Sequence, residues 1–84
     1  MSNKILIYTM EGCGHCNKLK NKLDSNKISY TNRDINTYNE EYEKVAKKLD
    51  TDFIPLVNIK NTWLAPEKNF NTIDECVEII KSMI

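Results

Sequence analysis

The chain has 84 residues, with twelve basic and twelve acidic side chains and a formal net charge of zero. This length predicts one domain over residues 1–84 with a small core, because so short a chain buries only about two-thirds of its unfolded surface. The balanced charge argues against partners such as nucleic acid or an anionic membrane. No apolar run reaches the length of a membrane span, and residues 1–4 lead to a strand without a signal segment, so we expect a cytoplasmic protein.

Strand and helix patterns alternate along the first half of the chain. The uninterrupted apolar run at residues 5–8 predicts a strand covered on both faces. A helix is expected from residue 14 to about residue 26, with Cys16, Leu19 and Leu23 on one side. The period-two pattern at the start of residues 28–34 predicts a second strand, and Ile35-Asn36 a turn.

The second half continues with a helix, a hairpin and a last helix. Thr37 and Glu40 have the capping-box spacing that opens a helix, and apolar residues then recur at helical spacing: Tyr38, Tyr42, Val45, Ala46 and Leu49. Residues 56–59 and 62–65 predict two strands joined by a two-residue turn at Lys60-Asn61. Thr72 and Glu75 form a second capping box, before a helix with the apolar stripe Ile73, Cys76, Val77, Ile80, Met83 and Ile84.

This order of elements predicts an α/β fold. It reads β-α-β-α-β-β-α, a four-stranded mixed sheet with three helices. Because crossovers between parallel strands are right-handed, the helices are expected to flank both faces of the sheet.

Two cysteines with a spacing of three, Cys13 and Cys16, directly follow the first strand. At this spacing on a helix two side chains share one face, so their sulfurs can close a disulfide or open to a dithiol. Cys13 falls where the unpaired N–H groups and the positive end of the helix dipole favour a thiolate and lower the pKa of a thiol. Cys16 lies one turn further in, so we expect it to be more buried, with a higher pKa. A C-x-x-C of this kind in a protein without an export signal is typical of a thiol–disulfide redox site.

Other interpretations of these residues remain open at this stage. The pair could be ordinary buried thiols in a non-catalytic binding module, or half of a zinc site. A structural zinc site needs four ligands, and only Cys76 and His15 are available to complete one, although His15 is held between the two cysteines. Cys76 lies on the apolar stripe of the last helix, which favours a place in the core over a third redox role. His15 is either an exposed residue or a tuning residue of the Cys13 thiolate.

Residues 7–16 (Ile-Tyr-Thr-Met-Glu-Gly-Cys-Gly-His-Cys) and Ile54-Pro55-Leu56-Val57 together resemble a glutaredoxin of the thioredoxin-like superfamily. The resemblance covers nearly the whole chain. It implies a thiol–disulfide oxidoreductase that serves electron transport and cell redox homeostasis, with Cys13 as nucleophile and Cys16 as resolving thiol. It also implies a cis Ile54–Pro55 bond beside Cys13, with Ile54 and Pro55 in contact with the substrate.

Three departures from the glutaredoxin pattern concern the co-substrate. Met10 stands where glutaredoxins carry a lysine that meets a glutathione carboxylate, Phe53-Ile54-Pro55 replaces the usual Thr-Val-Pro, and residues 61–66 contain no Gly-Gly pair. Glutathione is therefore an uncertain co-substrate. A related interpretation is a small redoxin that serves ribonucleotide reductase and is reduced by thioredoxin reductase. Another interpretation is an iron–sulfur carrier, in which a [2Fe–2S] cluster is bridged between two copies by the first cysteine and glutathione. We expect disulfide-containing protein substrates, no tightly bound cofactor, no metal ligands and a monomer.

The pair Gly14-His15 between the cysteines is typical of protein disulfide isomerase domains. A partly charged His15 beside the Cys13 thiolate would stabilise the reduced form and raise the reduction potential. The hypothesis is that this protein lies at the oxidising end of its family, which keeps open a role leaning toward disulfide oxidation or isomerisation.

Overall fold

The computed structural model describes residues 5–84, so the expectations that residues 1–4 carry no signal segment and lead into the first strand lie outside the described residues. The elements in chain order are β1 (Ile5–Thr9), α1 (Gly14–Ser25), β2 (Thr31–Asp34), α2 (Asn39–Leu49), β3 (Leu56–Ile59), β4 (Thr62–Leu64) and α3 (Ile73–Met83). The predicted order of strands and helices is confirmed.

The four strands form one mixed sheet in the order β2-β1-β3-β4. Strand β1 runs parallel to β2 and antiparallel to β3, with Tyr8 opposite Leu56. Strands β3 and β4 form the predicted hairpin. Its two turn residues, Lys60 and Asn61, both have positive φ (51° and 63°), which is the backbone of a type I′ turn.

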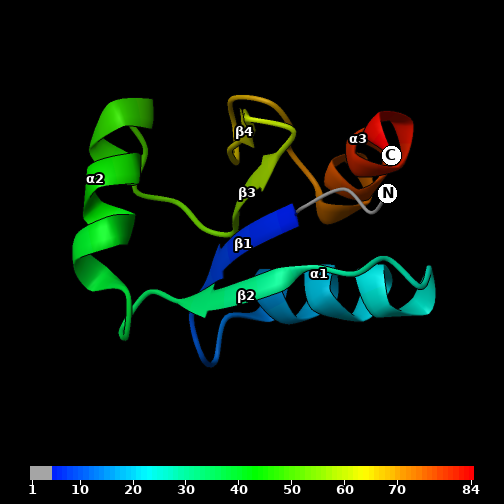
Figure 1. The fold of residues 1–84 in the computed structure, drawn as a ribbon, viewed down its shortest axis with the longest axis horizontal. Coiled ribbons are helices and arrows are strands. Elements are labelled where there is room, and N and C mark those ends of the chain that lie inside the picture. The colour runs from blue at the N-terminus through cyan, green and yellow to red at the C-terminus, as the bar shows by residue number, and fades with distance from the viewer. Residues whose placement is uncertain (1–4) are drawn as a thin grey trace.

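Helices cover both faces of the sheet, as predicted (Figure 1). On one face, Ile5 and Ile7 of β1 are buried in a cluster with apolar residues of α1 and α3. On the other face, Tyr8 and Leu56 are buried under α2, packed against side chains such as Tyr42. Strand β1 is therefore apolar along its length because both of its faces are covered.

The predicted apolar stripes of α1 and α3 are largely confirmed. Cys16, Leu19 and Leu23 of α1 are fully buried, and the buried residues of α3 are Ile73, Cys76, Val77 and Ile80. The capping box of α3 is present, because the Thr72 hydroxyl accepts the Glu75 N–H and the Glu75 carboxylate accepts the Thr72 N–H. The stripe ends one residue early, since Ile84 lies beyond α3 with half of its surface exposed.

Strand β2 starts at Thr31, so the prediction of a strand from residue 28 was wrong. The Ile28 N–H instead donates to the Leu23 carbonyl and closes the end of α1. Ile28 and Tyr30 then pack against the core formed with α1 and α3. The alternation of Ile28 and Tyr30 therefore reflects packing against the core and not pairing with a neighbouring strand.

The capping box predicted at Thr37 was also wrong. Helix α2 has Tyr38 at its N-cap position, with no hydrogen bond from a capping side chain. The N–H groups of Thr37 and Tyr38 both donate to the Asp34 carbonyl, and the Asp34 carboxylate accepts the Asn36 N–H. This turn holds Thr37 outside α2, so Thr37 does not occupy the N-cap position of the helix.

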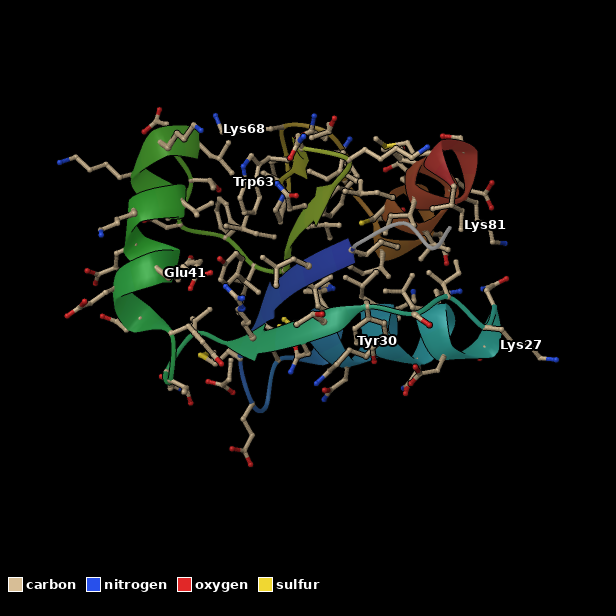
Figure 2. The ribbon with its side chains drawn as sticks, viewed as in Figure 1. Lys27, Tyr30, Glu41, Trp63, Lys68 and Lys81 are labelled. Atoms are coloured by element: carbon tan, nitrogen blue, oxygen red, sulfur yellow. The ribbon has the colours of Figure 1, made fainter. Side chains whose placement is uncertain are left out.

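A polar cluster attaches α2 to the sheet, where the helix buries only Ala46. The Glu41 carboxylate accepts a hydrogen bond from the Tyr8 hydroxyl and pairs with the Arg33 guanidinium. Figure 2 shows Glu41 on the side of α2 that faces the strands. The hydrogen bond from Tyr8, together with Arg33, lowers the pKa of Glu41, while burial raises the pKa of Tyr8 to about 12.

No helix within residues 5–84 is both long and apolar enough to cross a membrane.

Candidate active site

Cys13 occupies the N-cap position of α1. Its backbone is extended (φ −83°, ψ 113°), and its Sγ accepts the backbone N–H of Cys16 at 3.3 Å. The sulfur thus takes the place that a serine or aspartate oxygen takes in an ordinary N-cap. The Cys13 sulfur therefore lies at the positive end of the helix dipole, beside N–H groups that the first turn of α1 leaves unpaired.

The turn before α1 presents Cys13 to solvent. Gly12 has a φ of +83°, which side-chain-bearing residues rarely adopt. The Cys13 N–H donates to the Met10 carbonyl at 3.2 Å and closes this turn. Cys13 is consequently half-buried, with its sulfur held at the helix end.

Cys16 has the opposite environment. It is fully buried, and this burial, together with the hydrogen bond and charge of Cys13, raises the pKa of the Cys16 thiol to about 12. Its predicted burial and raised pKa are thus confirmed. The two sulfurs lie close together on one helical turn, yet the Cys13 side chain is partly exposed to solvent and the Cys16 side chain is buried in the core.

His15 is exposed in the first turn of α1, between the two cysteines. Its role in tuning Cys13 stays a prediction.

The loop before β3 meets the same edge of the sheet as the cysteines. The Ile54–Pro55 bond is cis, as the resemblance implied. Because Tyr8 lies opposite Leu56 in an antiparallel pair, the residues that leave β1 toward Cys13 run beside those that enter β3 from Pro55. Pro55 is buried and Ile54 half-buried. Topology thus brings together two motifs that lie about forty residues apart in the sequence.

Two exposed apolar side chains at this edge of the sheet were not identified as site residues from the sequence. Met10, at the start of the turn that carries Cys13, has 38% of its surface exposed, and Phe53, before the cis bond, has 54% exposed. The sequence signal that could have identified them is a large apolar residue within three positions of the C-x-x-C motif or of Ile54-Pro55.

The third cysteine lies away from this edge. Cys76 is fully buried in the core formed with α1 and α3, which confirms the packing interpretation, and burial raises the pKa of its thiol to about 12. Residues 5–84 gather no group of three or more histidine, cysteine or acidic side chains that could hold a metal ion.

The fold and the paired cysteines at the start of α1 define a protein of the thioredoxin-like class. Solved structures agree: the thioredoxin-like protein BC3987 superposes with a TM-score of 0.71 at 20% identity, over 95% of this chain and 99% of that one. A structure described only as a malarial protein superposes with a TM-score of 0.56 at 17% identity, over 100% of this chain and 99% of that one.

Residues 5–64 match the family model described as Glutaredoxin, so the chain belongs to the glutaredoxin family. Among curated proteins, the Gene 56 protein of Mycobacterium phage L5 is 32% identical over 53 residues. That alignment covers 63% of this chain and 52% of the phage protein, so the chain spans about half the length of this relative.

Proposed function

We propose that this protein is a dithiol thiol–disulfide oxidoreductase that reduces or exchanges disulfides of protein substrates through Cys13 and Cys16. The observation that carries the proposal is the contrast between the two sulfurs. The Cys13 sulfur accepts an N–H at a helix start, whereas the Cys16 thiol is buried with its pKa raised to about 12. Membership of the glutaredoxin family supports a thiol-redox role.

The proposed reaction has two steps. The Cys13 thiolate attacks one sulfur of the substrate disulfide, the substrate S–S bond breaks, and the first substrate sulfur leaves as a thiolate. Cys16 then loses its proton and attacks the Cys13 sulfur, which releases the second substrate thiolate and leaves the Cys13–Cys16 disulfide. Two electrons pass from the dithiol to the substrate, and the displaced thiolates take up protons from solvent.

We further propose that Ile54 and Pro55 contact the substrate and that His15 tunes the potential. The backbone of Ile54, half-buried at the edge beside Cys13, is available to pair with an extended substrate segment. A charged His15 stabilises the Cys13 thiolate and hence the reduced state. The variant His15→Tyr should then have a more negative reduction potential in a redox titration, and an unchanged potential would remove His15 from the mechanism.

Two cysteine variants test the proposed chemistry. Cys13→Ser should lose disulfide reductase activity, because the attacking thiolate is gone. Cys16→Ser should form a stable mixed disulfide with substrate, detectable as a mass increase that dithiothreitol reverses. Cys76→Ser serves as the matched control, since its thiol is buried away from the site and its loss should leave mixed-disulfide formation intact. Full activity of Cys13→Ser would overturn the assignment.

For the electron donor, we propose thioredoxin reductase in place of glutathione, as in redoxins that serve ribonucleotide reductase. Met10 supplies no positive charge for a glutathione carboxylate, and residues 61–66 contain no Gly-Gly pair that would open the backbone to glutathione. The oxidised protein should therefore be regenerated by thioredoxin reductase with NADPH faster than by reduced glutathione. The reverse order of rates would favour a glutathione-dependent glutaredoxin.

A further inference from the structure

Exposed apolar side chains gather at the edge of the sheet that carries Cys13. Among residues 5–84, four large hydrophobic side chains are exposed: Met10, Tyr38, Phe53 and Ile84. Met10 follows β1, Tyr38 follows β2 and Phe53 precedes β3. Because β1 and β2 are parallel and β3 is antiparallel to β1, these three segments all meet at one edge. In a chain with so small a core, this clustering marks a contact surface.

Of these three, Met10 lies in the turn that carries Cys13, and Phe53 precedes the cis Ile54–Pro55 bond at the same edge of the sheet. We call this pair the apolar rim. Tyr38 is engaged elsewhere, since the Arg33 guanidinium lies 5.2 Å from the centroid of its ring. Met10 contacts the site directly, because its carbonyl accepts the Cys13 N–H. Phe53 is fixed by its own N–H, which donates to the Thr51 hydroxyl at 3.2 Å.

An open groove of about 660 Å³ continues from Phe53 between the end of α2 and the loop after β4, lined also by Tyr42, Ala46 and Pro66. The charged side chains that line it are four acidic residues and two lysines. An acidic excess repels the carboxylates of glutathione, while the apolar side chains of Phe53, Ala46 and Pro66 in the lining can receive a polypeptide segment. The groove and the apolar rim are thus both suited to bind a polypeptide segment.

We propose that Met10 and Phe53 are specificity-determining residues that receive apolar side chains next to the reacting cysteine of an extended partner segment. This inference rests on the proposed function. A mixed disulfide holds the two cysteine Cα atoms only about 4.4–6.8 Å apart, so the residues beside the partner's cysteine must lie over the surface next to Cys13. The apolar rim is that surface, and the groove beside Phe53 receives the rest of the segment.

Two symmetric peptide disulfides test this specificity. Both are capped five-residue peptides joined through a central cysteine, with leucine on each side of the cysteine in one and serine in the other. The reduced protein is mixed with excess peptide disulfide, quenched in acid and alkylated, and its oxidation is followed by mass spectrometry. The rate of each peptide disulfide with dithiothreitol corrects for its intrinsic reactivity.

We expect the leucine peptide to oxidise the protein about ten-fold faster than the serine peptide, which corresponds to about 1.4 kcal/mol. The ratio should fall toward one in Met10→Lys combined with Phe53→Ser, and partly in each single variant. Ile84→Ser is the matched control, because it removes an exposed apolar side chain from the end of α3 and should keep the wild-type ratio.

Equal corrected rates for the two peptides with the wild-type protein would overturn the inference. So would a leucine preference that persists in the rim variants. The proposed function is tested separately with hydroxyethyl disulfide, which has no flanking residues. If hydroxyethyl disulfide oxidises the protein but the two peptides react equally, only the inference about the apolar rim is overturned. If none of the three disulfides oxidises the protein, the proposed function itself is overturned.

Discussion

Raising the pH from 7 to 10 should accelerate the second step of the proposed reaction, in which Cys16 attacks the mixed disulfide at Cys13. Burial raises the pKa of the Cys16 thiol to about 12, so the thiol is almost entirely protonated over this whole range. Below its pKa the thiolate fraction of a thiol increases ten-fold for each pH unit, which gives an upper limit of about 1,000-fold over three units.

The increase should level off before pH 12, for a reason visible in the structure. Part of the rise in the Cys16 pKa comes from the hydrogen bond and negative charge of Cys13. In the mixed disulfide Cys13 carries no charge, so this part disappears, while burial, the backbone hydrogen bond with Met10 and the charge of Lys20 still act on Cys16. The pH at which the rate reaches its plateau therefore measures the pKa of the Cys16 thiol without the contribution of Cys13.

The assay uses a peptide joined to thionitrobenzoate through a disulfide. Attack by Cys13 at the peptide sulfur releases coloured thionitrobenzoate and leaves the peptide on Cys13. The decay of this mixed disulfide is followed by acid quenching and mass spectrometry at each pH. In Cys16→Ser the adduct should persist at every pH. A wild-type decay rate that does not change between pH 7 and 10 would refute the buried, protonated state of Cys16.

Three further predictions concern stability. Thr72→Ala removes the hydroxyl that accepts the Glu75 N–H, and urea unfolding should show a loss of about 1 kcal/mol; an unchanged midpoint would show that the cap contributes nothing. Tyr8→Phe removes a hydrogen bond to the Glu41 carboxylate and should cost about 1.5–3 kcal/mol in the same assay, whereas a neutral effect would contradict the role of that bond in holding α2. The thiol of Cys76 keeps its proton up to about pH 12 when folded but loses it above about pH 9 when unfolded, so its contribution to stability is present below pH 9 and falls as the pH rises toward 12. Cys76→Ala should therefore lose stability less steeply than the wild type above pH 9, by about 1.4 kcal/mol per pH unit, and parallel pH profiles of the unfolding free energy would contradict this.

Local patterns predicted the elements whose hydrogen bonds and packing are local. The stripe of Cys16, Leu19 and Leu23 predicted the buried face of α1, because residues three and four apart share one face of any helix. The Lys60-Asn61 turn was predictable for a similar reason, since a two-residue loop admits few backbone conformations. The placement of Cys13 at the start of α1 also followed from the sequence.

Competition between local and distant partners explains the wrong prediction of a capping box at Thr37. Thr37 and Glu40 have the same spacing as Thr72 and Glu75, yet only the second pair forms a capping box. Asp34, at the end of β2, accepts the N–H groups of the residues before α2 and determines where that helix begins. The position of Asp34 depends on the pairing of β2 with β1, which no window of the sequence contains.

The sequence by itself determined the order of elements, the paired cysteines and the greater burial of Cys16, because all three depend on residues within one or two helical turns or on a continuous apolar run. The family resemblance implied that Pro55 lies beside Cys13, whereas only the tertiary structure revealed that Phe53 and Met10 are exposed at the same edge of the sheet. Strand pairing between β1 and β3 brings Phe53 and Pro55 to the edge where Met10 leaves the sheet. That meeting requires backbone hydrogen bonds between strands about fifty residues apart, and it creates the surface on which we expect the substrate to be selected.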